Sequence, residues 1–293
     1  MKEILCSTGA LIGRPNGRNY KLLKELSEQL SCDGLEFMMY SSWYEKSDEI
    51  VEDLHNMNLH IPVMHCEKHI GETISRNEKG DLQQALQLFE INCQMAHKIG
   101  ASKLVMHLWD GITSDQHFHN NLQAYAEVAS IAATYSLDLL VENVVCNKEN
   151  PMKHWCELAE RYPHIHFVFD TKMAAFHEQM PLIYEKEYEW LWTEDHIRHL
   201  HINDYGGGYM EWAKLKTLPI GDGHIDFKKF FDFLGAQDYR GDFTVEATAF
   251  DRQTGEVDTD MLNRCFATIR EGMNVATEEI EAKRENRTGE RFC

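Results

Sequence analysis

Residues 165–170 read Ile-His-Phe-Val-Phe-Asp, a short apolar run that ends in a carboxylate. Seven other runs along the chain have the same character. The eight runs are Glu3–Thr8, Gly34–Met39, His60–His65, Lys103–His107, Asp138–Glu142, Ile165–Asp170, Ile197–His201 and Asp242–Glu246. They are rich in Val, Ile, Leu, Phe and Met and do not alternate cleanly with polar residues. This pattern is typical of strands that are buried on both faces of a parallel sheet.

The segments between these runs have helical periodicity. Apolar residues recur at helical spacing in 19–30, 81–99, 117–135 and 259–282, and Asp226 is a predicted N-cap. Strand and helix alternating eight times over roughly 250 residues predict a single closed (β/α)₈ TIM barrel. The alternative is an open doubly wound sheet, which the lack of Gly-x-Gly-x-x-Gly after the first strand disfavours. We expect one barrel domain over 1–282 and a polar tail over 283–293.

The charge of the chain restricts the class of partner. Its 293 residues include 29 Lys and Arg and 48 Asp and Glu, for a net charge of −19. This balance argues against duplex nucleic acid and anionic membranes as partners. No apolar run approaches the roughly 18 residues of a transmembrane helix, and the start of the chain does not resemble a signal peptide. The eight cysteines form no Cys-x-x-Cys pair. We therefore expect reduced thiols and a cytoplasmic protein.

Seven of the eight runs carry a metal-competent side chain at or near their carboxyl end. These residues are Glu36, His65, His107, Glu142, Asp170, His201 and Glu246. Active sites of TIM barrels lie at that end, so the seven side chains are expected to converge. Burying so many carboxylates and imidazoles together requires compensation, which a divalent cation supplies. The oxygen and nitrogen donors suit Mn²⁺, Zn²⁺, Co²⁺ or Fe²⁺ better than Ca²⁺.

Each of these residues also has a structural explanation when taken alone. Asp170 is a candidate helix cap, and a histidine after an apolar strand is often a hydrogen-bonded core residue. We expect His166 and His199, which lie inside strands, to face the helix layer.

Several short motifs occur at these strand ends in a fixed order. They are Asp33-Gly34-Leu35-Glu36, Val141-Glu142-Asn143, Phe169-Asp170-Thr171, residues 199–204 (HLHIND), residues 219–227 (PIGDGHIDF) and Val245-Glu246. In this order they resemble the xylose-isomerase-like barrel superfamily of sugar isomerases and epimerases, a group that also contains the apurinic-site endonucleases. The resemblance extends over about residues 4–274.

The resemblance implies a metal centre. In this superfamily the equivalents of Glu142, Asp170, His201 and Glu246 hold one divalent ion, here expected to be Mn²⁺, Zn²⁺ or Co²⁺. In the epimerases the two glutamates, here Glu142 and Glu246, also transfer protons on opposite faces of a metal-stabilised enediolate. In the endonucleases a second ion uses the equivalents of His65, His107 and Glu142. One ion or two are therefore both open here.

The sequence departs from the superfamily at position 173. Many epimerases have a substrate-binding histidine three residues after the strand-six aspartate, and Met173 stands there. Lys172 and His177 are candidate replacements. The third endonuclease metal site also needs that histidine, together with residues that Leu215, Lys216 and Thr217 replace. The residues expected to contact substrate are Glu36, Trp109, Lys172, Asn203 and Arg14, although solvated loop arginines are the simpler interpretation of Arg14 and of the nearby Arg18.

Three functions are compatible with these residues. The first is a metal-dependent isomerase or epimerase acting on a small sugar, sugar phosphate, polyol or keto-acid, with a lyase or dehydratase as a variant. The second is a metal-dependent phosphodiesterase of the abasic-site endonuclease type. The third is a barrel that binds a ligand or metal without turnover. A homo-oligomer is left open, with Trp190, Trp192 and Trp212 as candidate interface residues.

Overall fold

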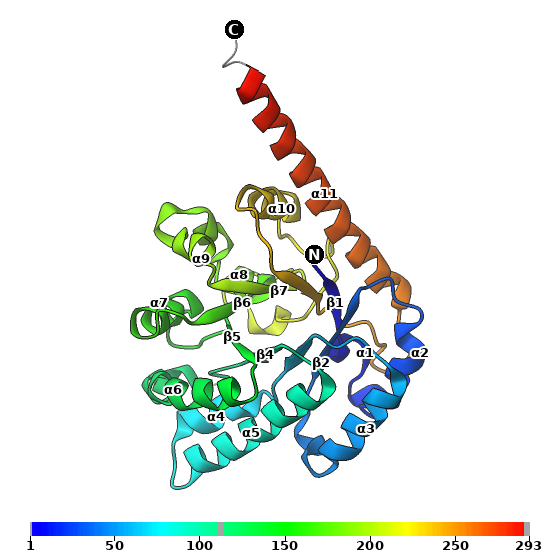
Figure 1. The fold of residues 1–293 in the computed structure, drawn as a ribbon, viewed down its shortest axis with the longest axis vertical. Helices are drawn as coiled ribbons and strands as arrows, with labels where there is room; N and C mark the ends of the chain where they lie inside the picture. The colour runs from blue at the N-terminus through cyan, green and yellow to red at the C-terminus, as the bar shows by residue number, and fades with distance from the viewer. Residues whose placement is uncertain (1, 111–113, 290–293) are drawn as a thin grey trace.

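A computed structural model shows eight parallel strands closed into a barrel and surrounded by helices (Figure 1). The structure describes residues 2–110 and 114–289, with side chains described for 2–110 and 115–276. The strands are β1 (Ile4–Ser7), β2 (Gly34–Met38), β3 (Val63–His65), β4 (Lys103–Met106), β5 (Asp138–Glu142), β6 (His166–Asp170), β7 (Ile197–Ile202) and β8 (Asp242–Val245). Each strand pairs with the next, and β8 pairs with β1. The predicted (β/α)₈ barrel is confirmed.

Helices connect the strands on the outside of the barrel. The α-helices are α1 (Thr8–Leu11), α2 (Leu23–Ser27), α3 (Ser47–Met57), α4 (His69–Arg76), α5 (Asp81–Ile99), α6 (Phe118–Thr134), α7 (Pro151–Arg161), α8 (Thr171–Phe176), α9 (Trp190–Thr193), α10 (Phe227–Ala236) and α11 (Thr259–Gly289). Short 3₁₀ helices occupy Arg14–Asn16, Tyr20–Leu22, Ser41–Lys46, Ser114–His117, Met180–Tyr184, Lys186–Tyr188 and Trp212–Lys214.

One helix begins at the cap that the sequence predicts, and another extends beyond its predicted end. Asp226 caps α10 as predicted, because its Oδ1 accepts the Lys229 N–H at 3.0 Å. The last helix continues past the expected end at residue 282, and α11 projects away from the barrel in Figure 1. No helix in the described ranges carries an apolar stretch long enough to cross a bilayer.

Side chains alternate between the inside of the barrel and the helix layer, and the inside is filled in layers. One layer is apolar and fully buried. It consists of Leu5, Val63, Val105, Leu140 and Val168. Because residues two apart along a strand face the same side, the inward residues that follow Val63, Val105, Leu140 and Val168 are His65, His107, Glu142 and Asp170. The alternation therefore carries these polar side chains to the carboxyl end of the barrel.

The other end of the barrel is closed by charged side chains. The Lys103 ammonium lies 2.6 Å from Asp242 Oδ2, and the Asp138 carboxylate meets His166 Nδ1. His166 is two residues before Val168 and shares its inward face. The expectation that His166 faces the helix layer is therefore wrong. The same rule places His199, two residues before His201, inside the barrel, and that expectation is wrong as well.

The long loop after β7 is organised by one carboxylate. Asp204 Oδ1 accepts the backbone N–H groups of Tyr205 at 2.8 Å and Ile225 at 3.1 Å. Its Oδ2 accepts those of Gly221 and Gly223, each at 2.9 Å. Asp204 is buried, and a Cβ at position 223 would lie 2.4 Å from Asp204 Oδ1, so glycine is required there. This loop follows the strand that supplies His201.

We expect Asp204→Ala to lower the free energy of unfolding by about 3 kcal/mol or more, because four N–H groups would lose a charged acceptor. Urea denaturation measures the change. Asp226→Ala is the matched control, since Asp226 caps one N–H and should cost about 1 kcal/mol. Equal losses in the two variants would show that Asp204 does not organise the loop.

Candidate metal centre

Four side chains from consecutive strands meet at the carboxyl end of the barrel. They are Glu142 from β5, Asp170 from β6, His201 from β7 and Glu246 directly after β8, and their ligand atoms all lie within 4.8 Å of one another. All four are buried. His201 Nδ1 lies 3.0 Å from Glu142 Oε1 and 3.7 Å from Glu246 Oε1. The structure thus brings together the four residues that the superfamily resemblance implied as ligands.

Asp170 caps a helix and also belongs to the group of ligand atoms. Its Oδ1 accepts the Met173 N–H at 2.7 Å and so caps α8. Its Oδ2 accepts the Asn203 side-chain N–H at 3.1 Å and lies 3.8 Å from the Lys172 ammonium. The Asn143 amide bonds to the backbone of Asp170 in both directions, at 2.6 and 3.0 Å. One oxygen therefore caps the helix, while the other contacts the side chains of Asn203 and Lys172.

A second group is centred on the same glutamate and consists of His65, His107 and Glu142. His65 Nδ1 donates to the Cys66 carbonyl at 2.8 Å, and its Nε2 lies 3.3 Å from Glu142 Oε2. His107 Nδ1 donates to Asp110 Oδ2 at 2.9 Å, and its Nε2 lies 2.7 Å from the same Glu142 oxygen. The two oxygens of Glu142 therefore face different groups, and this carboxylate lies between them.

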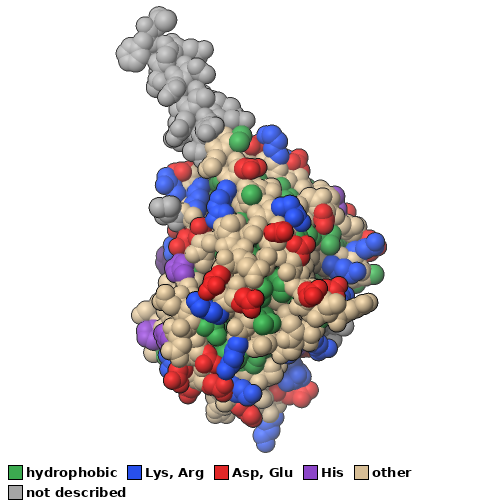
Figure 2. Space-filling view, turned by 90° about the vertical axis from the view of Figure 1, so that its right-hand side faces the viewer, with side chains coloured by type: hydrophobic (Ala, Val, Ile, Leu, Met, Phe, Trp, Pro, Cys, Tyr) green, Lys and Arg blue, Asp and Glu red, His purple; other side chains and the backbone are tan. Residues whose placement is uncertain are grey.

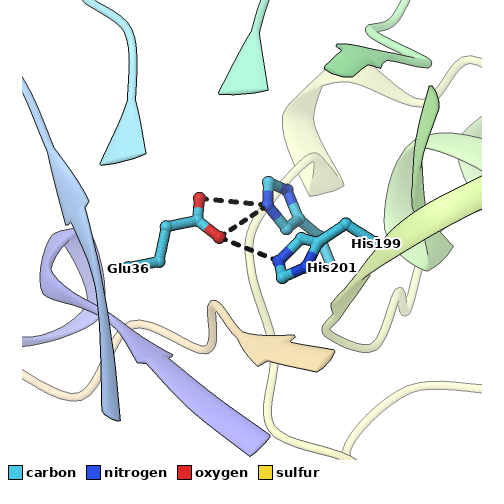
Figure 3. A group of neighbouring side chains, drawn as sticks. All are labelled: Glu36, His199 and His201. Atoms are coloured by element: carbon cyan, nitrogen blue, oxygen red, sulfur yellow. Dashed lines mark hydrogen bonds and ion pairs between the residues drawn. The ribbon is translucent and has the colours of Figure 1, made fainter. Parts of the chain in front are cut away.

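Below the centre, Glu36 of β2 reaches across the barrel to His199 and His201 of β7 (Figure 3). Its Oε2 accepts from His199 Nε2 at 3.0 Å, from His201 Nε2 at 3.2 Å and from the Thr244 hydroxyl at 2.7 Å. Burial alone would raise the pKa of Glu36, but the imidazoles of His201 and His199 hold it well below its usual value. Because His201 Nε2 is the donor to Glu36, its Nδ1 is left to face Glu142 and Glu246.

The donor set fits a divalent cation. Burial raises the pKa of Asp170 to about 6; Lys172 opposes this rise, and the nearby carboxylates of Glu142 and Glu246 add to it. A cation among these carboxylates would relieve their repulsion. The oxygen and nitrogen donors are those of Mn²⁺, Co²⁺ and Zn²⁺. We therefore regard Glu142, Asp170, His201 and Glu246 as residues that can hold such an ion.

The five residues that the sequence predicts to contact substrate do not all lie beside the four-residue group. Lys172 and Asn203 adjoin Asp170 at the centre. Glu36 is fully buried and bonds to His199, His201 and Thr244 of other strands. Trp109 is also fully buried, donates its indole N–H to the Val144 carbonyl at 3.0 Å and packs against Phe118. Arg14 is exposed in its 3₁₀ turn.

Met173 stands where many epimerases of the superfamily have a substrate-binding histidine. Met173 is buried and uses its backbone N–H to bond Asp170. His177 Nε2 accepts the Cys146 N–H at 2.9 Å, so this ring faces the loop after β5. Of the two candidate replacements, Lys172 is the one whose charged group lies beside the centre.

Sequence reasoning missed a cation at the centre. Lys68 follows β3, and its pKa is raised because the carboxylates of Glu246 and Glu142 outweigh the effect of burial. Tyr40 lies in the same field, and the Arg18 guanidinium stacks over its ring at 4.5 Å from the centroid. The only signal in the sequence was that Lys68 lies three residues after His65. Loop residues follow no periodicity that would have indicated their direction.

Several solved structures of sugar epimerases are similar in fold to this chain. An L-ribulose 3-epimerase matches with a TM-score of 0.70 and 16% identity over 96% of this chain and 98% of that chain. A D-allulose 3-epimerase from Methylomonas sp. matches with a TM-score of 0.67 and 16% identity over 92% and 98%. The 3-keto-D-glucoside 4-epimerase from E. coli matches with a TM-score of 0.63 and 14% identity over 92% and 99%.

A comparison with curated protein sequences found no match. The family model described as xylose isomerase-like TIM barrel matches residues 25–279, which is most of the chain. Together with the closed barrel, this match establishes that the chain belongs to the xylose isomerase-like TIM-barrel family.

Proposed function

We propose that the protein is a metal-dependent isomerase or epimerase of a small sugar or a related hydroxy-carbonyl compound. The observation that carries the proposal is the convergence of Glu142, Asp170, His201 and Glu246 within 4.8 Å at the carboxyl end of the barrel. The structural neighbours named as epimerases of ribulose, allulose and a keto-glucoside support a carbohydrate substrate. None of these neighbours supports a lyase or dehydratase.

These four residues would hold one divalent ion. The ion would polarise a carbonyl and a neighbouring hydroxyl of the substrate as a Lewis acid, and so acidify the C–H bond on the carbon next to the carbonyl. Asn203 and the α8 backbone orient Asp170, and Glu36 orients His201. With these supports the ligand atoms are fixed before substrate arrives, which is the preorganisation that catalysis requires.

Glu142 and Glu246 would perform the proton transfer. They come from β5 and from the end of β8, strands that are not neighbours in the barrel, so they approach a bound substrate from different sides. One carboxylate removes the proton from carbon and the other returns a proton to the opposite face. Glu246 is the more exposed of the two, at 9% against 1%. It is therefore the better placed to exchange its proton with solvent.

The cations beside the centre would bind the substrate. Lys68 lies in the field of Glu246 and Glu142, and Lys172 adjoins Asp170. An ammonium group at this position stabilises negative charge that develops on a substrate oxygen.

A second candidate is phosphodiester hydrolysis, which the His65, His107 and Glu142 group favours because two metals with a bridging carboxylate suit that reaction. The net charge of −19 opposes a nucleic-acid substrate. The face shown in Figure 2 intersperses acidic and basic side chains and presents no continuous basic surface. We therefore rank this function below the first.

We expect Glu246→Gln to lower turnover roughly 10²–10⁴-fold, because it removes one of the two proton-transfer groups. It should also weaken metal binding, since an amide is a poorer ligand than a carboxylate. The assay follows deuterium incorporation from D₂O next to the carbonyl of ketopentoses and ketohexoses. Elemental analysis gives the metal content of the same samples.

Glu256→Gln is the control, because Glu256 is exposed in the same loop after β8. It should leave exchange and metal content unchanged. Full exchange and full metal content in Glu246→Gln would remove Glu246 from the site.

Metal affinity should rise with pH. With its pKa near 6 in the metal-free protein, Asp170 carries a proton at lower pH, and a metal ion must displace it. We expect Mn²⁺ affinity to increase between about pH 5 and pH 8, as calorimetry with apo protein would measure. The same affinity throughout this range would contradict the role of Asp170 as a ligand.

Any second ion should be lost selectively in His107→Ala. His107 contributes to the group on Glu142 Oε2 and not to the four-residue group. In protein loaded with excess Zn²⁺, we expect this variant to hold one equivalent fewer than wild type and to keep its exchange activity. His55→Ala, a change at an exposed helical histidine, is the control. Loss of phosphodiesterase activity in His107→Ala, with no sugar exchange in wild type, would instead favour the second function.

A further inference from the structure

Three other side chains with metal-ligand atoms meet outside the centre described above. Asp115 lies in the 3₁₀ helix after β4, Cys146 in the loop after β5 and His154 in the first turns of α7. Their ligand atoms lie within 4.8 Å of one another, and all three residues are buried. The group shares no residue with the other groups of metal-competent side chains found among the described residues.

His154 is the residue that ordinary packing does not explain. Its side chain is 2% exposed, yet neither Nδ1 nor Nε2 has a hydrogen-bond partner in the described part of the chain. The ring stacks on Phe118 with centroids 3.7 Å apart. Burial lowers the pKa of His154 to about 4, so the imidazole is neutral at physiological pH and has a free lone pair. Buried imidazole nitrogens without partners are rare because each costs desolvation energy.

Asp115 shows the same incomplete pairing. Its Oδ2 accepts three backbone N–H groups, from Asn147 at 3.0 Å, Lys148 at 2.6 Å and Glu149 at 3.1 Å. Its Oδ1 is buried and, among the described residues, has no partner. Ligand atoms of Asp115 and His154 lie within 4.8 Å of each other, but no hydrogen bond between the two side chains is found among the described residues. Two such groups normally bond to each other when nothing lies between them.

Cys146 completes the donor set. Its thiol is fully buried and has only a weak contact with the Val144 carbonyl at 3.6 Å. Burial and Asp115 raise the pKa of this thiol, and the Trp109 indole N–H opposes the rise.

We propose that Asp115, Cys146 and His154 bind a Zn²⁺ ion, or another borderline-soft divalent cation, at a site separate from the four-residue centre. Sulfur, nitrogen and oxygen are all donor types that zinc binds, and a water molecule would fill the fourth tetrahedral position. On binding, the thiol of Cys146 loses its proton to solvent, while the neutral imidazole and the carboxylate bind without losing one.

The consequence for the fold is a link between segments at the carboxyl end of the barrel. The ion would join the segment after β4, the loop after β5 and α7, which follow the strands that lead to His107 and Glu142. This role is structural and does not depend on the proposed reaction.

Cobalt substitution tests the site independently of activity. A Co²⁺–thiolate bond gives an intense sulfur-to-metal charge-transfer band, and neither metal group of the barrel interior contains a cysteine. Apo protein titrated with Co²⁺ should develop this band. The band should be lost in Cys146→Ser, strongly reduced in His154→Gln, and retained in Glu246→Gln. Cys156→Ser, at an exposed cysteine of α7, is the matched control and should retain it.

Absence of the band in folded wild-type protein, or its persistence in folded Cys146→Ser, would overturn the proposal. Circular dichroism checks that each variant folds. If Cys146→Ser does not fold, the Co²⁺ titration of wild-type protein still decides between the two outcomes. Loss of the band in Glu246→Gln would also contradict it, since the sites would then not be separate.

Discussion

The burial of carboxylates and imidazoles together inside the barrel is the constraint on which the rest of the structure depends. Glu36, Glu142 and Asp170 are at most 1% exposed, and each would destabilise the fold if left uncompensated. The barrel compensates these buried charges with partners that are arranged in layers. Charged pairs close one end, an apolar layer follows, Glu36 and His199 lie above it, and the metal-competent group lies at the other end.

Within this arrangement, each imidazole of the two interior groups is held from its far side. A backbone carbonyl holds His65, Asp110 holds His107 and Glu36 holds His201. The nitrogen opposite each support faces Glu142. Hydrogen bonds of this kind fix the tautomer and the orientation of a ring before an ion binds. Glu142 is consequently the side chain that connects the two groups, and its two oxygens are not equivalent.

The sequence was sufficient to predict the barrel because buried parallel strands are continuous apolar runs, and α5 begins and ends at the predicted residues. The six candidate ligands could be found because the fold plan places strand ends together. The inward position of His199 follows from the alternation rule applied from His201, so that error was avoidable. Lys68 and the side chain of Trp109 lie beyond strand ends, where no periodicity sets direction. The Asp115, Cys146 and His154 group joins three segments whose spacing matches no motif.

The arrangement of Glu142, Asp170, His201 and Glu246 to hold a divalent ion is the central claim about this protein. A crystal structure of Zn²⁺-loaded protein with anomalous scattering data tests it most directly. We predict an anomalous peak at about 2.0–2.2 Å from a carboxylate oxygen of each acidic residue and from His201 Nδ1. We also predict that His201 Nε2 remains bonded to Glu36. No peak among these four side chains, or coordination through His201 Nε2, would contradict the claim.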